Sequence, residues 1–145
     1  MIYILLSLLA GAVLPLQALI NARLAAGVGS SLWAAAISFQ VGALGLLLVQ
    51  LALRAPWPEL GRVASVPSWI WSGGLFGAVY VASVIASVPR LGAASVISLV
   101  IFGQLTASLL LDHFGVLAPA PHPVNFMRLI GGALLLPGAI LIQRN

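Results

Sequence analysis

Five long apolar runs, separated by short breaks, restrict most strongly what this chain can fold into. A membrane-crossing helix needs about 20 consecutive apolar residues, so five crossings would use about 100 residues of the chain. Only six arginines and two acidic residues are charged among 145 residues, too few to cover the surface of a water-soluble globule. The sequence therefore predicts an all-α membrane protein with five transmembrane helices and argues against the soluble enzyme classes.

The breaks between the runs predict a single transmembrane domain over residues 1–145. Proline and charge follow the second run at 54–59, and a proline-arginine-glycine break lies at 89–92. The proline-rich segment 118–123 predicts a stiff, extended connector. The first run follows Met1 without a basic n-region, so we expect a span there rather than a cleaved signal peptide. The predicted helices cover about 2–22, 31–53, 67–88, 92–112 and 125–142.

The arginines divide equally between the two sides of this predicted topology. Arginine and lysine in short loops set the orientation of a membrane protein, so an equal count gives little bias. One alternative is that one arginine is buried and functional, so that the loops on one side of the membrane carry an excess of positive charge. The other is that the chain inserts in both orientations and pairs as an antiparallel homodimer. We predict the second, because such a dimer builds an inverted-repeat architecture from one chain. The two sets are Arg54, Arg62 and Arg128 against Arg23, Arg90 and Arg144.

Polar residues recur at helical spacing inside the apolar runs, where they are costly unless they face a bundle interior or a cavity. Gln17 and Asn21 are four residues apart, and Gln104, Ser108 and Asp112 repeat at the same interval. Glutamine both donates and accepts hydrogen bonds, so a cavity lined by such residues suits a neutral or weakly charged polar ligand. The candidate cavity-lining residues are Gln17, Asn21, Gln40, Tyr80 and Gln104.

The alternative is that these side chains only hold helices together. Hydrogen bonds between membrane helices contribute about 0.6 kcal/mol on average, which stabilises a bundle without any substrate. Both interpretations stay open for Asn21 and Gln40, and packing is the favoured one for Tyr80. Small residues at four-residue spacing predict close helix packing at Gly73 and Gly77, at Gly103, and along Ala34, Ser38 and Gly42.

Catalytic and metal-binding constellations are missing from the sequence. There is no cysteine, and Asp112-His113 is the one neighbouring acid–imidazole pair. We expect no enzyme activity, no metal and no cofactor. The arginines are scattered singly, which argues against a nucleic-acid partner because nucleic-acid binding needs a clustered basic face.

Segments along nearly the whole chain match the pattern of a known family. They are Gly11-Ala12-Val13-Leu14-Pro15-Leu16-Gln17 with Asn21-Ala22-Arg23-Leu24, Trp71-Ser72-Gly73-Gly74-Leu75-Phe76-Gly77-Ala78, Val88-Pro89-Arg90-Leu91-Gly92-Ala93-Ala94, Gly103-Gln104-Leu105 with Asp112-His113-Phe114-Gly115, and Arg128-Leu129-Ile130-Gly131. The chain resembles the YdcZ-type (DUF606-like) proteins, short five-helix members of the drug/metabolite transporter superfamily. The resemblance implies a bacterial inner-membrane protein that acts as a dimer of oppositely oriented copies.

The resemblance also implies kinship with the small multidrug resistance exporters, and one residue departs from their pattern. Those exporters carry a membrane-embedded glutamate in the first helix, where this chain offers Gln17, which cannot titrate. Proton-coupled export of cations is therefore not supported. We predict an inner-membrane transporter of an unknown small molecule, surrounded by membrane lipid and working as a dimer around a polar midplane cavity. Two alternatives are a passive ion or solute pore and a non-transporting membrane assembly subunit.

Overall fold

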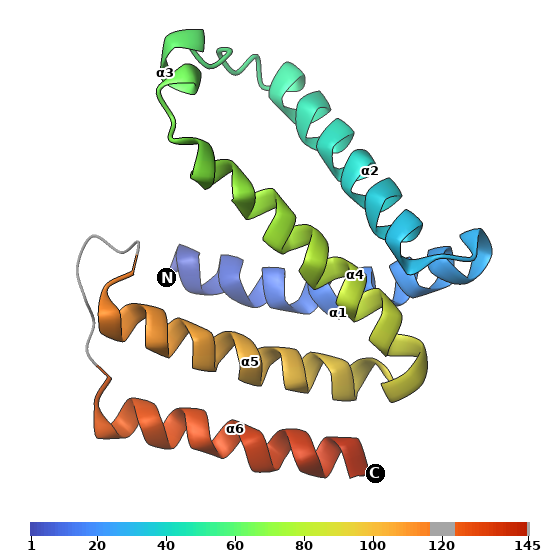
Figure 1. Ribbon diagram of the computed structural model, residues 1–145, viewed down its shortest axis with the longest axis vertical. Coiled ribbons are helices and arrows are strands. Elements are labelled where there is room, and N and C mark those ends of the chain that lie inside the picture. The colour runs from blue at the N-terminus through green and yellow to red at the C-terminus, as the bar shows by residue number, and fades with distance from the viewer. Residues whose placement is uncertain (117–123, 145) are drawn as a thin grey trace. The chain divides into compact units, whose positions relative to one another are not determined.

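The structure, a computed structural model, describes residues 1–116 and 124–144 and is built from helices (Figure 1). The chain divides into two compact units, Met1–Ala86 and Ser87–Asn145, and the fourth α-helix begins in the first unit and ends in the second. The connector predicted over 118–123 lies outside the described residues. The elements are α1 (Ile2–Val28), α2 (Ser31–Ala52), α3 (Leu60–Ala64), the 3-10 helix η1 (Ser68–Ser72), α4 (Gly73–Leu91), α5 (Ala93–Phe114) and α6 (Phe126–Arg144).

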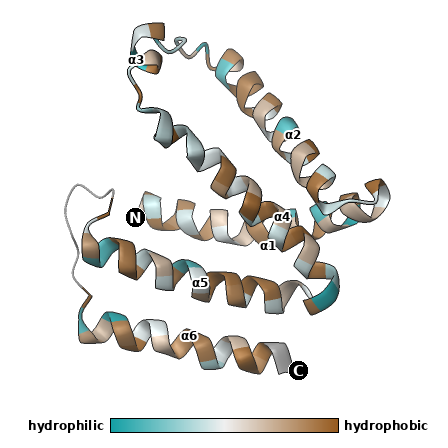
Figure 2. Cartoon of the chain, viewed as in Figure 1, coloured by the Kyte–Doolittle hydropathy of each residue, from teal (hydrophilic) through white to brown (hydrophobic). Residues whose placement is uncertain are grey.

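Most of these helices are long and apolar enough to cross a membrane. Within the described chain this holds for α1, α2, the stretch Ser68–Leu91 and α5. The apolar part of α6, Phe126–Ile142, is shorter and lies near the lower limit of about 17 residues for a crossing. The hydrophobic colour, brown, predominates along the ribbons of the long helices, and the hydrophilic colour, teal, lies at helix ends and connections and at a few places within α2 and α5 (Figure 2). The predicted all-α membrane fold is confirmed.

Glycine, rather than charge, ends α1. The sequence predicts an end near 22, but the helix continues to Val28 because alanine, arginine and leucine are strong helix formers. It stops where Gly29 adopts the left-handed conformation, with φ of 75°. The Ser30 hydroxyl then accepts a hydrogen bond from the Trp33 backbone N–H at 3.3 Å and caps α2. Arg23 consequently lies inside α1 instead of in a loop.

The predicted break at 89–92 also occurs at its glycine. Pro89 remains inside α4, which continues to Leu91. Gly92 has φ of 79°, and its N–H donates to the Val88 carbonyl at 3.0 Å before α5 begins at Ala93. The connection between the two helices is a single residue long, which agrees with the nearly absent loop expected there.

The core of the first unit lies where α1, α2 and α4 meet. Ala34 is 0% exposed, and Ala35 and Ile85 are buried beside it. Because lipid tails are as apolar as leucine, close packing rather than the hydrophobic effect holds such helices together. The alanines of α2 admit this close approach. The partly buried neighbours of this core are Leu24, Ala25, Val81 and Ala82.

The second unit is dominated by an α5–α6 pair, in which the helices run antiparallel (Figure 1). Asp112 near the end of α5 pairs with Arg128 in the first turn of α6, with 3.5 Å between Oδ2 and Nη1. The Asn125 side chain accepts from the Arg128 backbone N–H at 2.9 Å and caps α6. His113 Nδ1 accepts from the Val124 backbone N–H at 3.2 Å. These contacts fix the ends of the two helices facing the connector.

Candidate functional site

Three of the five predicted cavity residues meet in the first unit. Gln17 and Asn21 lie one helical turn apart on α1, and Tyr80 approaches from α4. They line a cavity of about 10 Å³, which we call the polar cavity. This volume is close to that occupied by one water molecule. The other lining residues are apolar, namely Leu14, Ala18, Val81, Val84 and Ile85.

Asn21 is the buried polar group of this cavity. The residue is 4% exposed, and its side-chain Nδ2 has no hydrogen-bond partner among the described residues. An amide buried without a hydrogen bond costs about 1–3 kcal/mol. A side chain that only holds helices together would use its donor on a neighbouring helix. The described chain supplies no such acceptor, so the Asn21 amide is available to a group that enters the cavity.

Gln17 also lines a second, larger cavity beside the first. This cavity has a volume of about 300 Å³, and we call it the Phe39 cleft. The polar cavity and the Phe39 cleft share Gln17 and Val81, so they are adjoining parts of one region. The remaining residues of the cleft are Ser38, Phe39, Gly42, Ala43 and Leu46, all from α2.

The small-residue stripe of α2 has two different roles along its length. Ala34 is fully buried and packs in the core, as the predicted close approach requires. Ser38 and Gly42, on the same face one and two turns later, line the Phe39 cleft instead. A Cβ added to Gly42 would meet no atom within 4 Å. The four-residue spacing therefore marked the correct face but did not distinguish packing from a cavity wall.

The other two predicted cavity residues lie elsewhere. Gln40 is on an exposed side of α2 and is not among the residues that line the Phe39 cleft. Gln104 is exposed on α5, in the second unit, and Ser108 on the same helix is also exposed. Gln40 is absent from the residues that line the polar cavity, and a cavity-lining role for Gln104 stays a prediction. Phe39 and Leu46, in contrast, were not predicted, because an apolar side chain on an apolar helix gives no distinguishing signal.

The glycines predicted to pack differ in their surroundings. A Cβ at Gly77 would lie 3.5 Å from Cζ of Phe39, so the absence of a side chain on α4 leaves space for that ring. No atom lies within 4 Å of a Cβ built at Gly73 or Gly103. Close packing at Gly73 and Gly103 stays a prediction. A second copy of the chain that packs against these glycines would fulfil it.

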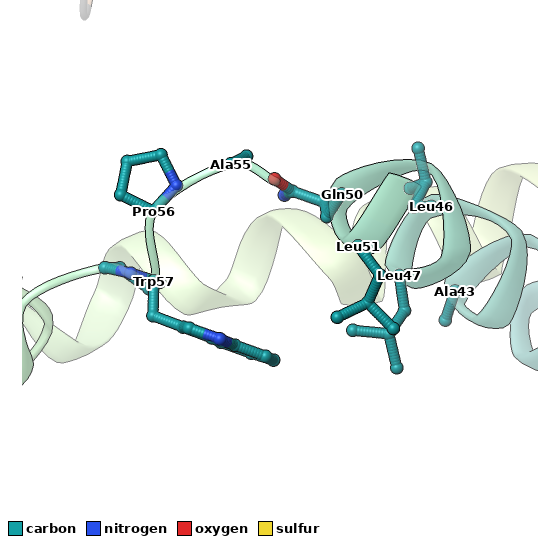
Figure 3. Close-up of a pocket in the computed structure, with 9 residues that line it drawn as sticks. Ala43, Leu46, Leu47, Gln50, Leu51, Ala55, Pro56 and Trp57 are labelled. Atoms are coloured by element: carbon teal, nitrogen blue, oxygen red, sulfur yellow. The ribbon is translucent and has the colours of Figure 1, made fainter. Parts of the chain in front are cut away.

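Two further cavities lack the predicted site residues. One of about 400 Å³ lies at the end of α2, where the Trp57 ring sits on the same side as Leu47 and Leu51 (Figure 3). A tryptophan at a helix end is typical of the membrane interface. The other, of about 490 Å³, lies between α5 and α6 and is lined mainly by apolar residues such as Phe102 and Leu136.

The two acidic side chains of the sequence lie outside the polar cavity and the Phe39 cleft. Glu59 pairs with Arg62 at 3.1 Å in the exposed segment after α2, and Asp112 pairs with Arg128. None of the residues lining the two adjoining cavities is charged. The site is therefore polar but without a countercharge for an ion. Among the described residues there is also no group of three or more metal-binding side chains.

A protein-family model described as "Putative inner membrane exporter, YdcZ" matches residues 2–141 of the chain. The chain belongs to the YdcZ family. The resemblance found in the sequence is thus confirmed over nearly the whole length. No curated protein and no solved structure matches the chain.

Membership of the YdcZ family fixes the broad setting of the site. The chain is a multi-pass protein of the inner membrane, and its family is one of transporters. Within that setting, the polar cavity holds a buried amide that has no hydrogen-bond partner in the described chain.

Proposed function

We propose that the chain is a small-molecule exporter whose substrate binds at the polar cavity and the Phe39 cleft. The unpaired, buried amide of Asn21 is the observation that carries this proposal. In hydrocarbon such a group is usually found where it faces a cavity or a transport path. Gln17 continues the polar surface from Asn21 into the larger cleft, which supplies room for a ligand.

We further propose that the working form is an antiparallel homodimer, with one copy inverted relative to the other. The equal division of six arginines between the two sides supports insertion in both orientations. A pair of inverted copies has the symmetry of inverted-repeat transporters, in which alternating access results from exchange of the two conformations. Gln40 and Gln104 are both exposed in the single chain. In the dimer, these glutamines of each copy line the transport path that the two copies form together.

Transport and its dependence on Gln17 test the proposal. Compounds that raise the melting temperature of the purified protein are identified first, and a radiolabelled one is then used in liposomes. We expect saturable uptake that is stimulated by the same compound on the opposite side. Gln17→Ala should weaken the apparent binding free energy by about 0.5–1.5 kcal/mol, because one hydrogen bond between the ligand and the cavity wall is lost.

Leu19→Ala is the control on the same helix, since Leu19 is exposed and lines neither the polar cavity nor the Phe39 cleft. Its transport should equal that of the unmodified chain. Flux that rises linearly with concentration and shows no counter-stimulation would indicate a pore instead. Absence of flux, with a stable larger complex in the membrane, would indicate an assembly subunit.

A further inference from the structure

The two adjoining cavities differ in chemical character, and this difference restricts the ligand. The polar cavity presents the Asn21 amide, whose Nδ2 is a hydrogen-bond donor without a partner in the described chain. The Phe39 cleft presents an aromatic ring and aliphatic side chains, with Gln17 and Ser38 as its polar members. A ligand that spans both must carry a hydrogen-bond acceptor at one end and an apolar body at the other.

The absence of a countercharge restricts the ligand further. No residue lining either cavity is charged. Arg23 is two residues beyond Asn21 on α1, about 200° around the helix, and its side chain is exposed. An ion moved from water into such a site loses its hydration without gaining a partner, at a cost of several kcal/mol. An uncharged ligand does not incur this cost.

The dimensions agree with a small ligand. The cavity beside Asn21 has a volume of only about 10 Å³, enough for one acceptor atom of a ligand and not for a ring. The apolar body must therefore lie in the Phe39 cleft, whose volume of about 300 Å³ is at the lower end of ligand pockets. Gly42 forms part of that wall, and a side chain there would project into open space.

We infer that the site binds an uncharged amphiphile, with a carbonyl or similar acceptor at Asn21 Nδ2 and an apolar, preferably aromatic, body against Phe39. This inference rests on the proposed function for its biological meaning. It adds the substrate class and the orientation of the ligand in the site. Cations, the cargo implied by kinship with small multidrug exporters, are excluded by the same geometry.

A series of four probes with nearly the same shape tests the class directly. Benzamide is neutral and carries the acceptor, benzamidinium is the cation, benzoate is the anion, and α-methylstyrene is neutral but has no acceptor. Binding of each is measured by titration calorimetry on the purified chain in lipid nanodiscs, with empty nanodiscs as the blank. Benzamide should bind saturably, and each of the other three about tenfold or more weakly. For α-methylstyrene the reason is the lost hydrogen bond, and for the two ions it is the loss of hydration without a countercharge.

Three variants locate the binding. Asn21→Leu, which has nearly the same shape, should weaken benzamide about tenfold and remove its advantage over α-methylstyrene. Gly42→Leu should abolish benzamide binding by filling the Phe39 cleft. Gly45→Leu is the matched control, because Gly45 is on the same helix, also has open space around it and does not line the cleft. It should bind benzamide as the unmodified chain does.

The inference is overturned if benzamidinium or benzoate binds as tightly as benzamide, or if benzamide shows no saturable binding. It is equally overturned if Gly42→Leu and Gly45→Leu have the same effect. Binding at equilibrium does not require transport, so these results separate the two proposals. A chain that transports a charged compound through Gln17 would contradict the substrate class and leave the exporter proposal intact. A chain that binds benzamide but transports nothing would contradict the exporter proposal and leave the inferred ligand class intact.

Discussion

At the scale of single residues, Asn21 is in a position that stability alone would give to an apolar side chain. Its neighbours Ala18, Val84 and Ile85 are all buried and apolar. The side-chain donor of Asn21 is buried and has no hydrogen-bond partner in the described chain. Positions of this kind reduce stability, and a binding function explains why a polar residue occupies one.

Asn21→Leu should therefore stabilise the chain by about 1–3 kcal/mol, because the penalty for the unpaired amide disappears and the shape is kept. Reversible unfolding in detergent micelles measures the free energy. Gln50→Leu, at an exposed position near the end of α2, is the control and should change stability little. A lower stability for Asn21→Leu would show that the amide holds helices together through a contact beyond the described residues.

The sequence predicted residues on one helix better than residues that meet from different helices. Gln17 and Asn21 share a face because they are one turn apart, a relation that spacing alone determines. Phe39 lines the same cavity as Gln17 only because the chain turns at Gly29, which sets the register of α2 against α1. Gln40 is next to Phe39 in sequence but about 100° away around the helix, which directs it away from the cleft. Register between helices is not encoded in any local pattern.

At the scale of elements, the long apolar helices were predictable, but the ends of α1 and α4 were not. Apolar runs determine the crossings, since hydrocarbon thickness sets their length. The sequence interpretation ended helices at the first charge or proline, yet Arg23 and Pro89 both lie inside helices. The helices end at Gly29 and Gly92, where positive φ is required. In a membrane every backbone group needs an internal partner, which favours continuing a helix until the backbone must turn.

Gly77 tests helix packing in the first unit. A methyl group would contact the Phe39 ring at an ordinary distance of 3.5 Å, so Gly77→Ala should be tolerated and gain up to about 1 kcal/mol of helix propensity. Gly77→Leu should destabilise by about 1–3 kcal/mol, because the larger side chain displaces that ring. Melting in detergent measures both.

Gly73→Leu is the matched substitution one turn earlier on α4, where nothing lies within 4 Å. The monomer should melt as before. If Gly73 packs against a second copy, this variant should lose dimer in chemical cross-linking while keeping its fold. Equal destabilisation by Gly73→Leu and Gly77→Leu would contradict the account of Phe39 given above.

At the scale of the whole molecule, charge balance is the feature that determines orientation. Arg54, Arg62 and Arg128 are on one side of the membrane in the five-helix topology. Arg62 and Arg128 are paired with acidic side chains, but acidic residues contribute little to orientation. The division of three against three stays a prediction of the five-helix topology, and on that basis we expect both orientations in one membrane.

Two lysines inserted after Pro56 should abolish the mixture of orientations, because they change the count to five against three. A Leu60→Cys reporter in the exposed α3 shows the result when intact cells are labelled with a membrane-impermeant reagent. Without the inserted lysines, only a fraction of the Leu60→Cys chains should be labelled. With the lysines, either all of the chains or none should be labelled. Transport should fall for the biased chain and return when a chain with the opposite bias is coexpressed. A Leu60→Cys reporter that is uniform before the insertion would disprove dual topology.

Access of water to Gln17 inside the membrane is the central claim, and cysteine labelling tests it most directly. The chain has no cysteine, so each variant carries a single thiol. Gln17→Cys is compared with Leu19→Cys: both positions are exposed in the single chain, but Gln17 lines the two adjoining cavities, whereas Leu19, about 200° around α1, lines neither. A hydrophilic, membrane-impermeant thiol reagent should label Gln17→Cys in native membranes and leave Leu19→Cys, which faces lipid, unlabelled until the protein is denatured. Labelling of both positions at the same rate, or of neither, would contradict a transport path lined by Gln17.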